Sequence, residues 1–226
     1  MTKQELFDEW PEKYESWFQT PIGGLVRKVE GQLINKMVIP KPGEMLLDAG
    51  CGTGIFTTDF LAAGCQVVGL DISRPMLKLA AGKAVKSPFS VVEGDIRRLP
   101  FRDGVFDKAV SITALEFIAE AKEAIDELFR VTRPGGVVVV ATLNSLSSWA
   151  ERRKNKTRKG QRHILENAYY RSGKELMGFS LYPGAVRSVV HFKKDDEVET
   201  AVEEERRGEE QNRETGAFVA ARWEKK

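Results

Sequence analysis

The stretch LLDAGCGTG, residues 46–54, decides the fold of this chain. An apolar run ends in an acid and leads into three alternate glycines, and residues 55–63 behind them can form a helix that Gly64 ends. Glycine tolerates positive φ angles and lets a ligand approach the backbone with no Cβ atom in the way. A strand, a glycine turn and a helix in this order are typical of an open α/β sheet, whose ligands bind at the carboxyl ends of the strands. The sequence therefore predicts a ligand-binding turn at 48–54.

The spacing of the glycines argues against two common nucleotide-binding loops. In the dinucleotide fingerprint GxGxxG the third glycine follows the second by three positions, and that position here is Ile55. A P-loop requires Gly-Lys followed by Ser or Thr, and the loop is not followed by that sequence. The pattern therefore favours neither a nicotinamide dinucleotide nor a nucleoside triphosphate.

Two acids follow the next two predicted strands. Asp71 ends the run 66–70, at the place where an acid can accept both hydroxyl hydrogens of a ribose. Asp95 follows the run 89–92, where a carboxylate could accept a hydrogen bond from an exocyclic amine. Either acid alone could be a turn residue, but their common register with the glycine loop favours a ligand. The negative edge that they create suits a cationic sulfonium better than a pyrophosphate.

Apolar runs and helix signals alternate along the middle of the chain. Alternation with helices of roughly ten residues predicts right-handed βαβ units and a doubly wound parallel sheet. Strands are expected at 45–47, 66–70, 89–92, 106–112 and 137–143, helices at 55–63, 73–84 and 122–131, and two later strands at 185–192 and 216–223.

We expect one domain over residues 1–226 with four parts. Residues 1–42 form an N-terminal helical cover, broken near Thr20-Pro21, and residues 43–143 form the cofactor-binding core. Residues 144–184 are a substrate-side insert, in which Ser172 and Glu175 can form a capping box for a helix at 173–179. Residues 185–226 hold the last two strands and a charged connection at 193–214, expected as a solvated helix or a linker.

The successive motifs of the chain resemble those of class I S-adenosylmethionine-dependent methyltransferases, the type 11 group in particular. The resemblance covers residues 45–143, and the segments 14–30 and 216–225 are also similar to that group. It implies an α/β, Rossmann-like sheet of seven mostly parallel strands, with an antiparallel last strand beside strand five. The motifs are LLDAGCGTG (46–54), VVGLDIS (67–73), VEGDIRRLPF (92–101), FDKAVSITALEFI (106–118) and LFRVTRPGGVVVVATLN (128–144).

The resemblance also implies S-adenosylmethionine as co-substrate and a set of residues that bind it. The loop residues Gly50, Cys51, Gly52 and Gly54 would lie along its methionine portion, and Asp48 would orient the loop. The remaining members would hold the ribose and adenine, border the methionine portion or close the site from the N-terminal cover; they are Asp71, Ile72, Asp95, Ile96, Thr113, Tyr14 and Trp17. Packing within the cover is the alternative role for Tyr14 and Trp17.

The catalytic residues cannot be assigned from motifs, because a sulfonium needs mainly an aligned acceptor, and a base only if the acceptor must lose a proton. The candidates are Glu116, Asn144 and His163, at the ends of the fourth and fifth strands and in the insert. The basic segment 152–162 could be a solvated loop or a mobile lid that contacts an anionic acceptor.

The amino-acid composition limits the kinds of molecule that the protein is expected to bind. The formal net charge is only +2, which argues against nucleic acid or a membrane surface as partner. Two cysteines without metal-ligand spacing predict no metal site, and the charged N-terminus predicts no signal peptide, so a cytoplasmic protein is expected. We therefore expect methyl transfer to a small-molecule acceptor. The alternatives are an RNA or protein methyltransferase that uses residues 152–162, and a non-catalytic S-adenosylmethionine-binding module that docks through residues 193–214.

Overall fold

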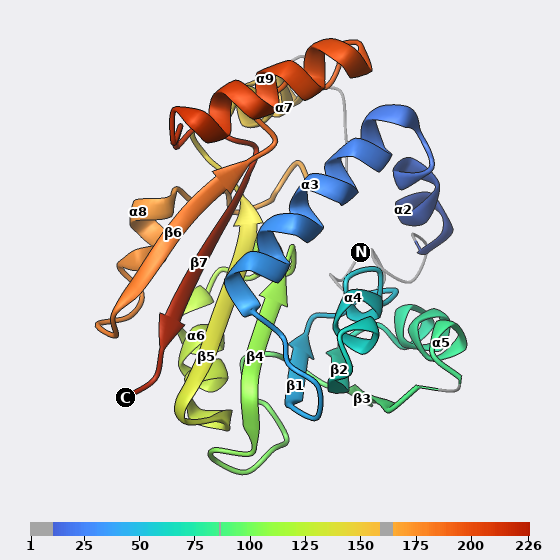
Figure 1. Ribbon diagram of the computed structural model, residues 1–226, viewed down its shortest axis with the longest axis vertical. Helices are drawn as coiled ribbons and strands as arrows, with labels where there is room; N and C mark the ends of the chain where they lie inside the picture. The colour runs from blue at the N-terminus through green and yellow to red at the C-terminus, as the bar shows by residue number, and fades with distance from the viewer. Residues whose placement is uncertain (1–10, 86, 159–164) are drawn as a thin grey trace.

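A single mixed sheet organises the protein. The computed structural model describes residues 11–85, 87–158 and 165–226, without the side chains of 11–14, 156 and 158. Within these residues seven strands are hydrogen-bonded in the order β3-β2-β1-β4-β5-β7-β6 (Figure 1). The strands are β1 (Met45–Ala49), β2 (Gln66–Asp71), β3 (Phe89–Glu93), β4 (Phe106–Ile112), β5 (Thr132–Leu143), β6 (Gly184–Val189) and β7 (Phe218–Glu224).

Strands β1 to β5 are parallel, and β7 runs antiparallel to both of its neighbours, β5 and β6. The last strand of the described chain therefore lies inside the sheet and not at its edge, and the expected antiparallel strand beside strand five is confirmed. Since β1 lies between β2 and β4, the order of the strands reverses there. Open α/β sheets bind ligands at such a reversal, beside the carboxyl ends of the strands.

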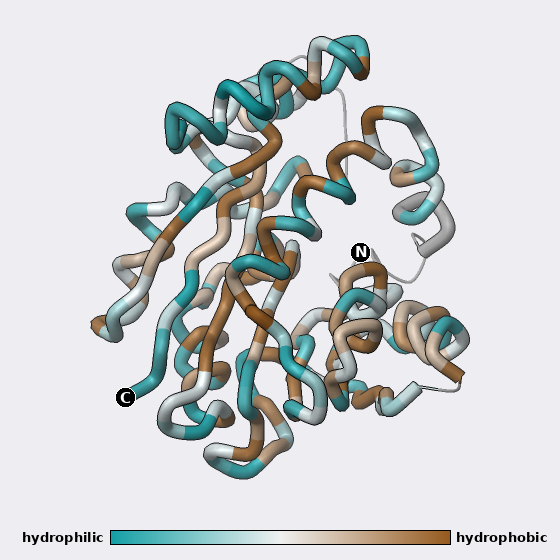
Figure 2. Tube along the Cα trace, viewed as in Figure 1, coloured by the Kyte–Doolittle hydropathy of each residue, from teal (hydrophilic) through white to brown (hydrophobic). Residues whose placement is uncertain are grey.

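Helices cover both faces of the sheet, and β5 shows why each face is apolar. Val139 packs in the core cluster under α3 (Pro21–Val38) and α4 (Thr57–Ala62). Val138 and Val140 face the opposite cluster, under α6 (Ala121–Val131) and α8 (Gly173–Met177). A parallel strand buried on both faces needs this unbroken apolar run. Figure 2 shows the apolar residues concentrated in the strands and on the inner sides of the helices.

The N-terminal cover consists of α2 (Pro11–Phe18) and α3, joined at Thr20. The Thr20 hydroxyl accepts a hydrogen bond of 3.1 Å from the backbone N–H of Gly23 and so caps α3. Pro21 occupies the first turn of the helix, where no backbone N–H is needed. The break predicted at Thr20-Pro21 is therefore a capped helix start, which brings α2 over the carboxyl edge of the sheet (Figure 1).

Several elements differ from the sequence prediction in extent or type. The insert begins with a helix, α7 (Ser148–Arg158), where a solvated loop or a lid was expected. Strand β5 begins at Thr132 and not at Val137, because Thr132 pairs with Phe106 before the ladder shifts register. The later strands are displaced by one to three residues. The charged connection contains α9 (Val198–Glu210), one of its two expected forms.

The short elements α5 (Arg74–Lys83) and η1 (Leu115–Phe117) complete the carboxyl edge. Helix α5 begins at the predicted cap, since the Ser73 hydroxyl accepts a hydrogen bond from the N–H of Met76. Among the described residues, none of the helices has both the length and the apolar character to cross a membrane.

Candidate functional site

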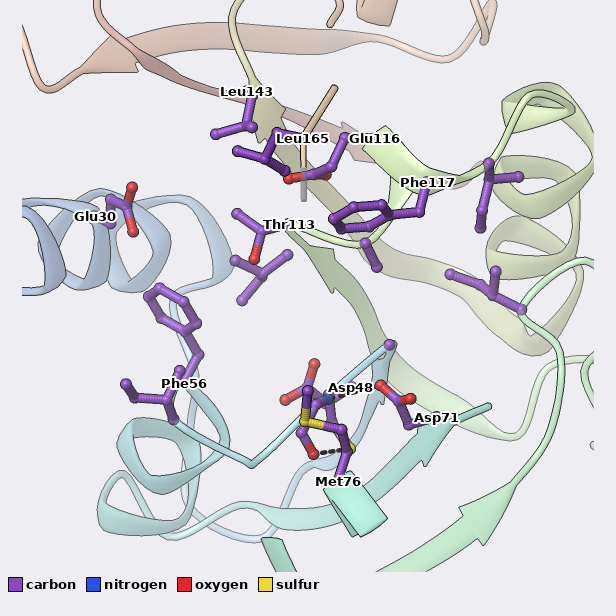
Figure 3. A pocket seen from close by; sticks show the side chains of 18 of the residues that line it. Glu30, Asp48, Phe56, Asp71, Met76, Thr113, Glu116, Phe117, Leu143 and Leu165 are labelled. Atoms are coloured by element: carbon purple, nitrogen blue, oxygen red, sulfur yellow. Dashed lines mark hydrogen bonds between the residues drawn. The ribbon is translucent and has the colours of Figure 1, made fainter. Parts of the chain in front are cut away.

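A cavity of about 800 Å³ opens at the carboxyl ends of β1, β2 and β4. Its volume lies in the range of about 300–1,000 Å³ that is typical of small-molecule sites. Figure 3 shows side chains converging on it from the strand ends and from α3. Its lining divides into a lower part around the glycine loop and an upper part below α3 and α7, and the two parts differ in chemistry.

The glycines of the loop have different roles. Gly50 has φ +79°, its N–H donates to the Leu70 carbonyl over 2.6 Å, and a Cβ atom there would collide with the side chain of Ala114. Gly52 has φ +55°, and a Cβ atom there would meet no protein atom within 4 Å. Gly50 is therefore required by packing, whereas Gly52 leaves backbone open to a ligand. Gly54 packs toward Ala80 and is not among the cavity-lining residues.

The Asp71 carboxylate connects the loop to the end of β2. One oxygen accepts from the N–H of Gly52 over 2.8 Å, and the other accepts from the N–H of Ser73 over 2.9 Å. Backbone N–H groups of the loop and of the turn before α5 therefore hold both oxygens in place. Asp71 lines the cavity together with Ile72, whose side chain is 39% exposed there.

Asp48 lies beneath the loop and is only 2% exposed. Its carboxylate accepts a hydrogen bond of 2.6 Å from the Thr57 hydroxyl at the start of α4. Burial raises the pKa of Asp48 to about 7, against the lowering effect of Thr57 and with a smaller contribution from the charge of Asp71. Asp48 therefore ties the loop to α4, while it still lines the cavity.

Asp95 and Ile96 lie on the far side of the same part of the cavity. The Arg97 guanidinium donates to both Asp95 oxygens, over 2.6 Å at the shortest, and this hydrogen bonding lowers the pKa of Asp95. Arg97 also pairs with Glu120 over 3.1 Å. Asp95 is therefore held as a carboxylate, and Ile96 beside it is a buried apolar wall.

Thr113 and Cys51 complete the predicted lining. Thr113 adopts the left-handed region with φ +50°, and its N–H donates to the Ala141 carbonyl over 2.9 Å, so its strained backbone is held at the end of β4. Cys51 lines the cavity but is buried, and burial raises the pKa of its thiol well above the usual range. A thiol with this pKa is no nucleophile near neutral pH.

The upper part of the cavity holds two buried carboxyl groups. Glu116, a predicted catalytic candidate, is 1% exposed, and its carboxyl accepts from the Thr142 hydroxyl over 3.0 Å. Glu30 on α3 is 7% exposed and was missed in the sequence. Burial raises the pKa of Glu116 to about 7 and that of Glu30 to about 8. The sequence did contain a signal for Glu30: it is an acidic residue on the buried side of α3, four residues after Val26.

Aromatic side chains and one arginine surround these carboxyls. The Arg153 guanidinium lies 5.5 Å from the ring centroid of Trp149 and 5.9 Å from that of Tyr170. Trp149 is fixed by a 2.7 Å hydrogen bond from its indole N–H to the Phe192 carbonyl. Trp17 meets it edge to face at 6.4 Å and lines the cavity, so it both packs against other aromatic rings and borders the cavity.

Among the predicted catalytic candidates with described side chains, Asn144 is not brought to the cavity. Asn144 is buried away from it: its amide nitrogen donates to the carbonyls of Glu214 and Gly216, and its oxygen accepts from the N–H of Leu146. With its hydrogen bonds used in joining β5 to the loop before β7, Asn144 is no longer a catalytic candidate. The side chain of Tyr14 and the whole of His163 lie outside the described residues. The described part of the chain also contains no group of three His, Cys, Asp or Glu side chains suited to a metal ion.

The sequence of this chain is similar to those of known methyltransferases. Residues 47–140 match the family model of the type 11 methyltransferase domain. The chain is 37% identical over 113 residues to a malonyl-[acyl-carrier protein] O-methyltransferase of Serratia marcescens, covering 50% of this chain and 44% of that protein. It is 36% identical over 136 residues to a demethylmenaquinone methyltransferase of Renibacterium salmoninarum, covering 60% and 56%. The chain thus spans about half the length of these relatives.

A solved structure resembles the whole chain. A Thermotoga maritima protein, described as an S-adenosylmethionine-dependent methyltransferase and possible histamine N-methyltransferase, superimposes with a TM-score of 0.77. The match covers 98% of this chain and 99% of that one at 21% identity, which shows a shared fold.

Proposed function

We propose that this protein, whose residues 47–140 match the model of a methyltransferase domain, transfers the methyl group of S-adenosylmethionine to a small-molecule acceptor. The observation that carries the proposal is the acidic, glycine-lined edge of the sheet. Gly52 leaves room for a ligand at the backbone, and the Asp71 carboxylate lines the cavity at the end of β2, where it adds negative charge.

The residues present fit the co-substrate part by part. Asp71 would accept the ribose hydroxyls, and Ile72 and Ile96 would enclose the adenine, whose amine Asp95 would bind. The exposed Ile72 side chain supports this, since a large apolar residue at a cavity wall is stabilised when a flat ring covers it. The open backbone of Gly52 and the Thr113 turn would border the methionine portion.

The bound co-substrate supplies an electrophilic methyl group, and the chain supplies position and a water-poor site. Holding two reactants in line can lower a barrier by up to about 7–11 kcal/mol. Thr113, between the lower and upper parts of the cavity in Figure 3, marks where the acceptor would meet the methyl group. The apolar walls of the upper part, from Phe56, Trp149 and Leu165, would exclude water.

The alternative of an RNA or protein acceptor at the basic segment 152–162 gains no support from the two arginines at its start. Arg152 pairs with Asp195, and Arg153 lines the cavity between aromatic rings. Neither arginine contributes to an open basic surface of the kind that binds a phosphate backbone.

Calorimetry with S-adenosylmethionine, S-adenosylhomocysteine and NAD tests the proposal. We expect both sulfur ligands to bind with micromolar dissociation constants, which correspond to about 8 kcal/mol, and NAD not to bind. A metabolite extract incubated with methyl-labelled co-substrate should then yield a labelled product. Binding of NAD without either sulfur ligand, or binding without any label transfer, would contradict the proposed activity.

A further inference from the structure

Two carboxyl groups face each other across the upper part of the cavity. Glu30 comes from α3 and Glu116 from η1, and Figure 3 shows both side chains directed toward the space above Thr113. Both line the cavity, and each is more than nine-tenths buried. This is the position of the acceptor in the proposed function.

Neither carboxyl is neutralised by a direct ion pair with a described residue. Glu116 accepts a hydrogen bond from Thr142, whereas the Glu30 carboxyl has no hydrogen-bond partner among the described residues. The charged groups that act on them at longer range are Arg27 on α3, Arg153 on α7, Arg171 before α8, and each other. A buried carboxyl without a partner costs free energy, so the arrangement is completed by something that enters the cavity.

The surroundings distinguish between a cationic and an anionic occupant. Two carboxyls repel an anion, and the Arg153 guanidinium already lies between the rings of Trp149 and Tyr170. An ammonium group would instead relieve the burial of both acids and donate to their free oxygens. The cavity wall beside the ammonium group consists of Trp17, Phe56 and Leu165. These apolar side chains favour a ligand in which the ammonium group is attached to an apolar body.

We propose that Glu30 and Glu116 form the acceptor subsite and that they select a primary or secondary amine on an apolar body, which enters as an ammonium ion. This inference rests on the proposed methyl transfer. The ionised carboxylate of one glutamate takes a proton from the ammonium nitrogen, leaving a neutral amine and a carboxylic acid. The nitrogen lone pair then forms the N–C bond as the S–C bond breaks, and the bonding pair stays on sulfur, which becomes neutral.

The raised pKa values of the two glutamates support the proton transfer without carrying the argument. In the ligand-free site, burial raises the pKa values of Glu116 and Glu30 to about 7 and 8. Each glutamate is therefore a stronger base than an exposed glutamate, and its pKa lies near neutral pH, which suits a general base.

Calorimetry on the complex with S-adenosylhomocysteine tests the subsite with three probes of matched shape: phenethylamine, 3-phenylpropionate and 2-phenylethanol. We expect phenethylamine to bind at least tenfold more tightly than either of the others. Its binding should release protons, counted from the heats in two buffers of different ionisation enthalpy. With methyl-labelled S-adenosylmethionine it should be the probe that is labelled.

Glu30→Gln and Glu116→Gln should each reduce the preference for phenethylamine at least tenfold and diminish the proton release, with the affinity for S-adenosylhomocysteine unchanged. Glu205→Gln is the matched control, because Glu205 is also buried but binds the backbone N–H groups of Val190 and His191 from α9. It should keep the preference. Thermal melting shows whether each variant is folded. If Glu116→Gln does not fold, Glu30→Gln alone tests the subsite.

Three results would overturn the inference: tighter binding of 3-phenylpropionate than of phenethylamine, a preference for the amine that survives both substitutions, or binding of none of the probes. A wild-type protein that does not bind S-adenosylhomocysteine contradicts the proposed function itself. A protein that binds it and shows no preference for the amine contradicts only the subsite.

Discussion

At the scale of single residues, the glycine loop assigns packing and ligand access to different positions. Gly50 is pressed against Ala114 and hydrogen-bonded to β2, while Gly52 lies open to the cavity. Both have positive φ angles, which cost roughly 1–2 kcal/mol for a residue with a side chain. The same substitution at the two positions should therefore have different consequences.

Gly50→Ala should lower the free energy of unfolding by more than this backbone cost, because its methyl group collides with Ala114. Gly52→Ala should lose about 1–2 kcal/mol of stability but weaken binding of S-adenosylmethionine strongly. Urea unfolding and calorimetry measure the two effects. Ala114→Gly should restore part of the stability of Gly50→Ala and nothing to Gly52→Ala. Equal effects of the two alanines on stability and binding would contradict this division.

Asp71→Asn should weaken binding of S-adenosylmethionine by about 1.5–3 kcal/mol, since hydrogen bonds to a charged acceptor are the stronger ones. The amide also cannot accept from the N–H groups of Gly52 and Ser73 with both of its terminal atoms, so the loop is loosened. Asp59→Asn, on α4 and paired with Arg27, is the control and should bind normally. If folded Asp71→Asn has an unchanged dissociation constant, Asp71 does not bind the co-substrate and serves only to stabilise the turn.

The residues that follow strands were predictable, whereas those brought in by helices were not. Asp71 and Asp95 end or follow predicted strands, and parallel strands end at one edge, so their spacing predicts that they lie together, whereas Asp48 and Thr113 were expected from the resemblance to class I methyltransferases. Glu30 reaches the cavity only because α3 crosses the sheet, and no local pattern sets that crossing. Asn144 shows the opposite case, since it follows a strand but turns toward the backbone of residues 214 and 216.

At the scale of elements, α7 is the main departure from the sequence prediction. Its charged sequence lacks a regular apolar stripe, so it was expected as a loop or a lid, yet Trp149 and Ala150 are buried at its start. Tertiary packing of these two residues outweighs the weak amphipathic pattern of the rest. By contrast α8 was predictable, because the capping box of Ser172 and Glu175 is a local signal.

The basic residues of α7 should consequently differ from one another. Lys154→Ala, at an exposed position, and Arg152→Ala, at an ion pair near the surface, should each change the free energy of unfolding by no more than about 0.5 kcal/mol. Arg153→Ala should cost more than about 1 kcal/mol, because it removes a cation held by two aromatic rings. Urea unfolding of the three variants measures this; an equal, small effect for all would make α7 a solvated helix along its whole length.

At the scale of the whole molecule, the buried carboxyls make stability depend on pH. Burial raises the pKa values of Asp48 and Glu116 to about 7 and of Glu30 to about 8. A raised pKa in the folded state gives stability that is present below the unfolded pKa and is lost as the pH rises through the folded value. Asp95 and Glu127 have lowered pKa values through hydrogen bonds from Arg97 and Arg130, and their contribution is lost only in acid.

The ligand-free protein should therefore be less stable at pH 9 than at pH 6, by about 2 kcal/mol or more. Urea unfolding at the two pH values measures the difference. Glu30→Gln should reduce it, because the amide does not ionise, whereas Glu123→Gln on the exposed side of α6 should leave it unchanged. Constant stability from pH 6 to 9 would mean that the buried acids ionise without cost.

The antiparallel insertion of β7 between β5 and β6 has a consequence for biosynthesis. As the nascent chain leaves the ribosome, β6 emerges before the strand that must separate it from β5. At translation rates of about 5–20 residues per second, the 35 residues from 190 to 224 take roughly 2–7 s to make. During that interval the apolar edge of β5 from Val137 to Ala141 has no partner on the side that β7 will occupy. Chaperone capture of stalled chains should therefore be strongest for nascent chains that end between β6 and β7, and should fall once β7 has emerged.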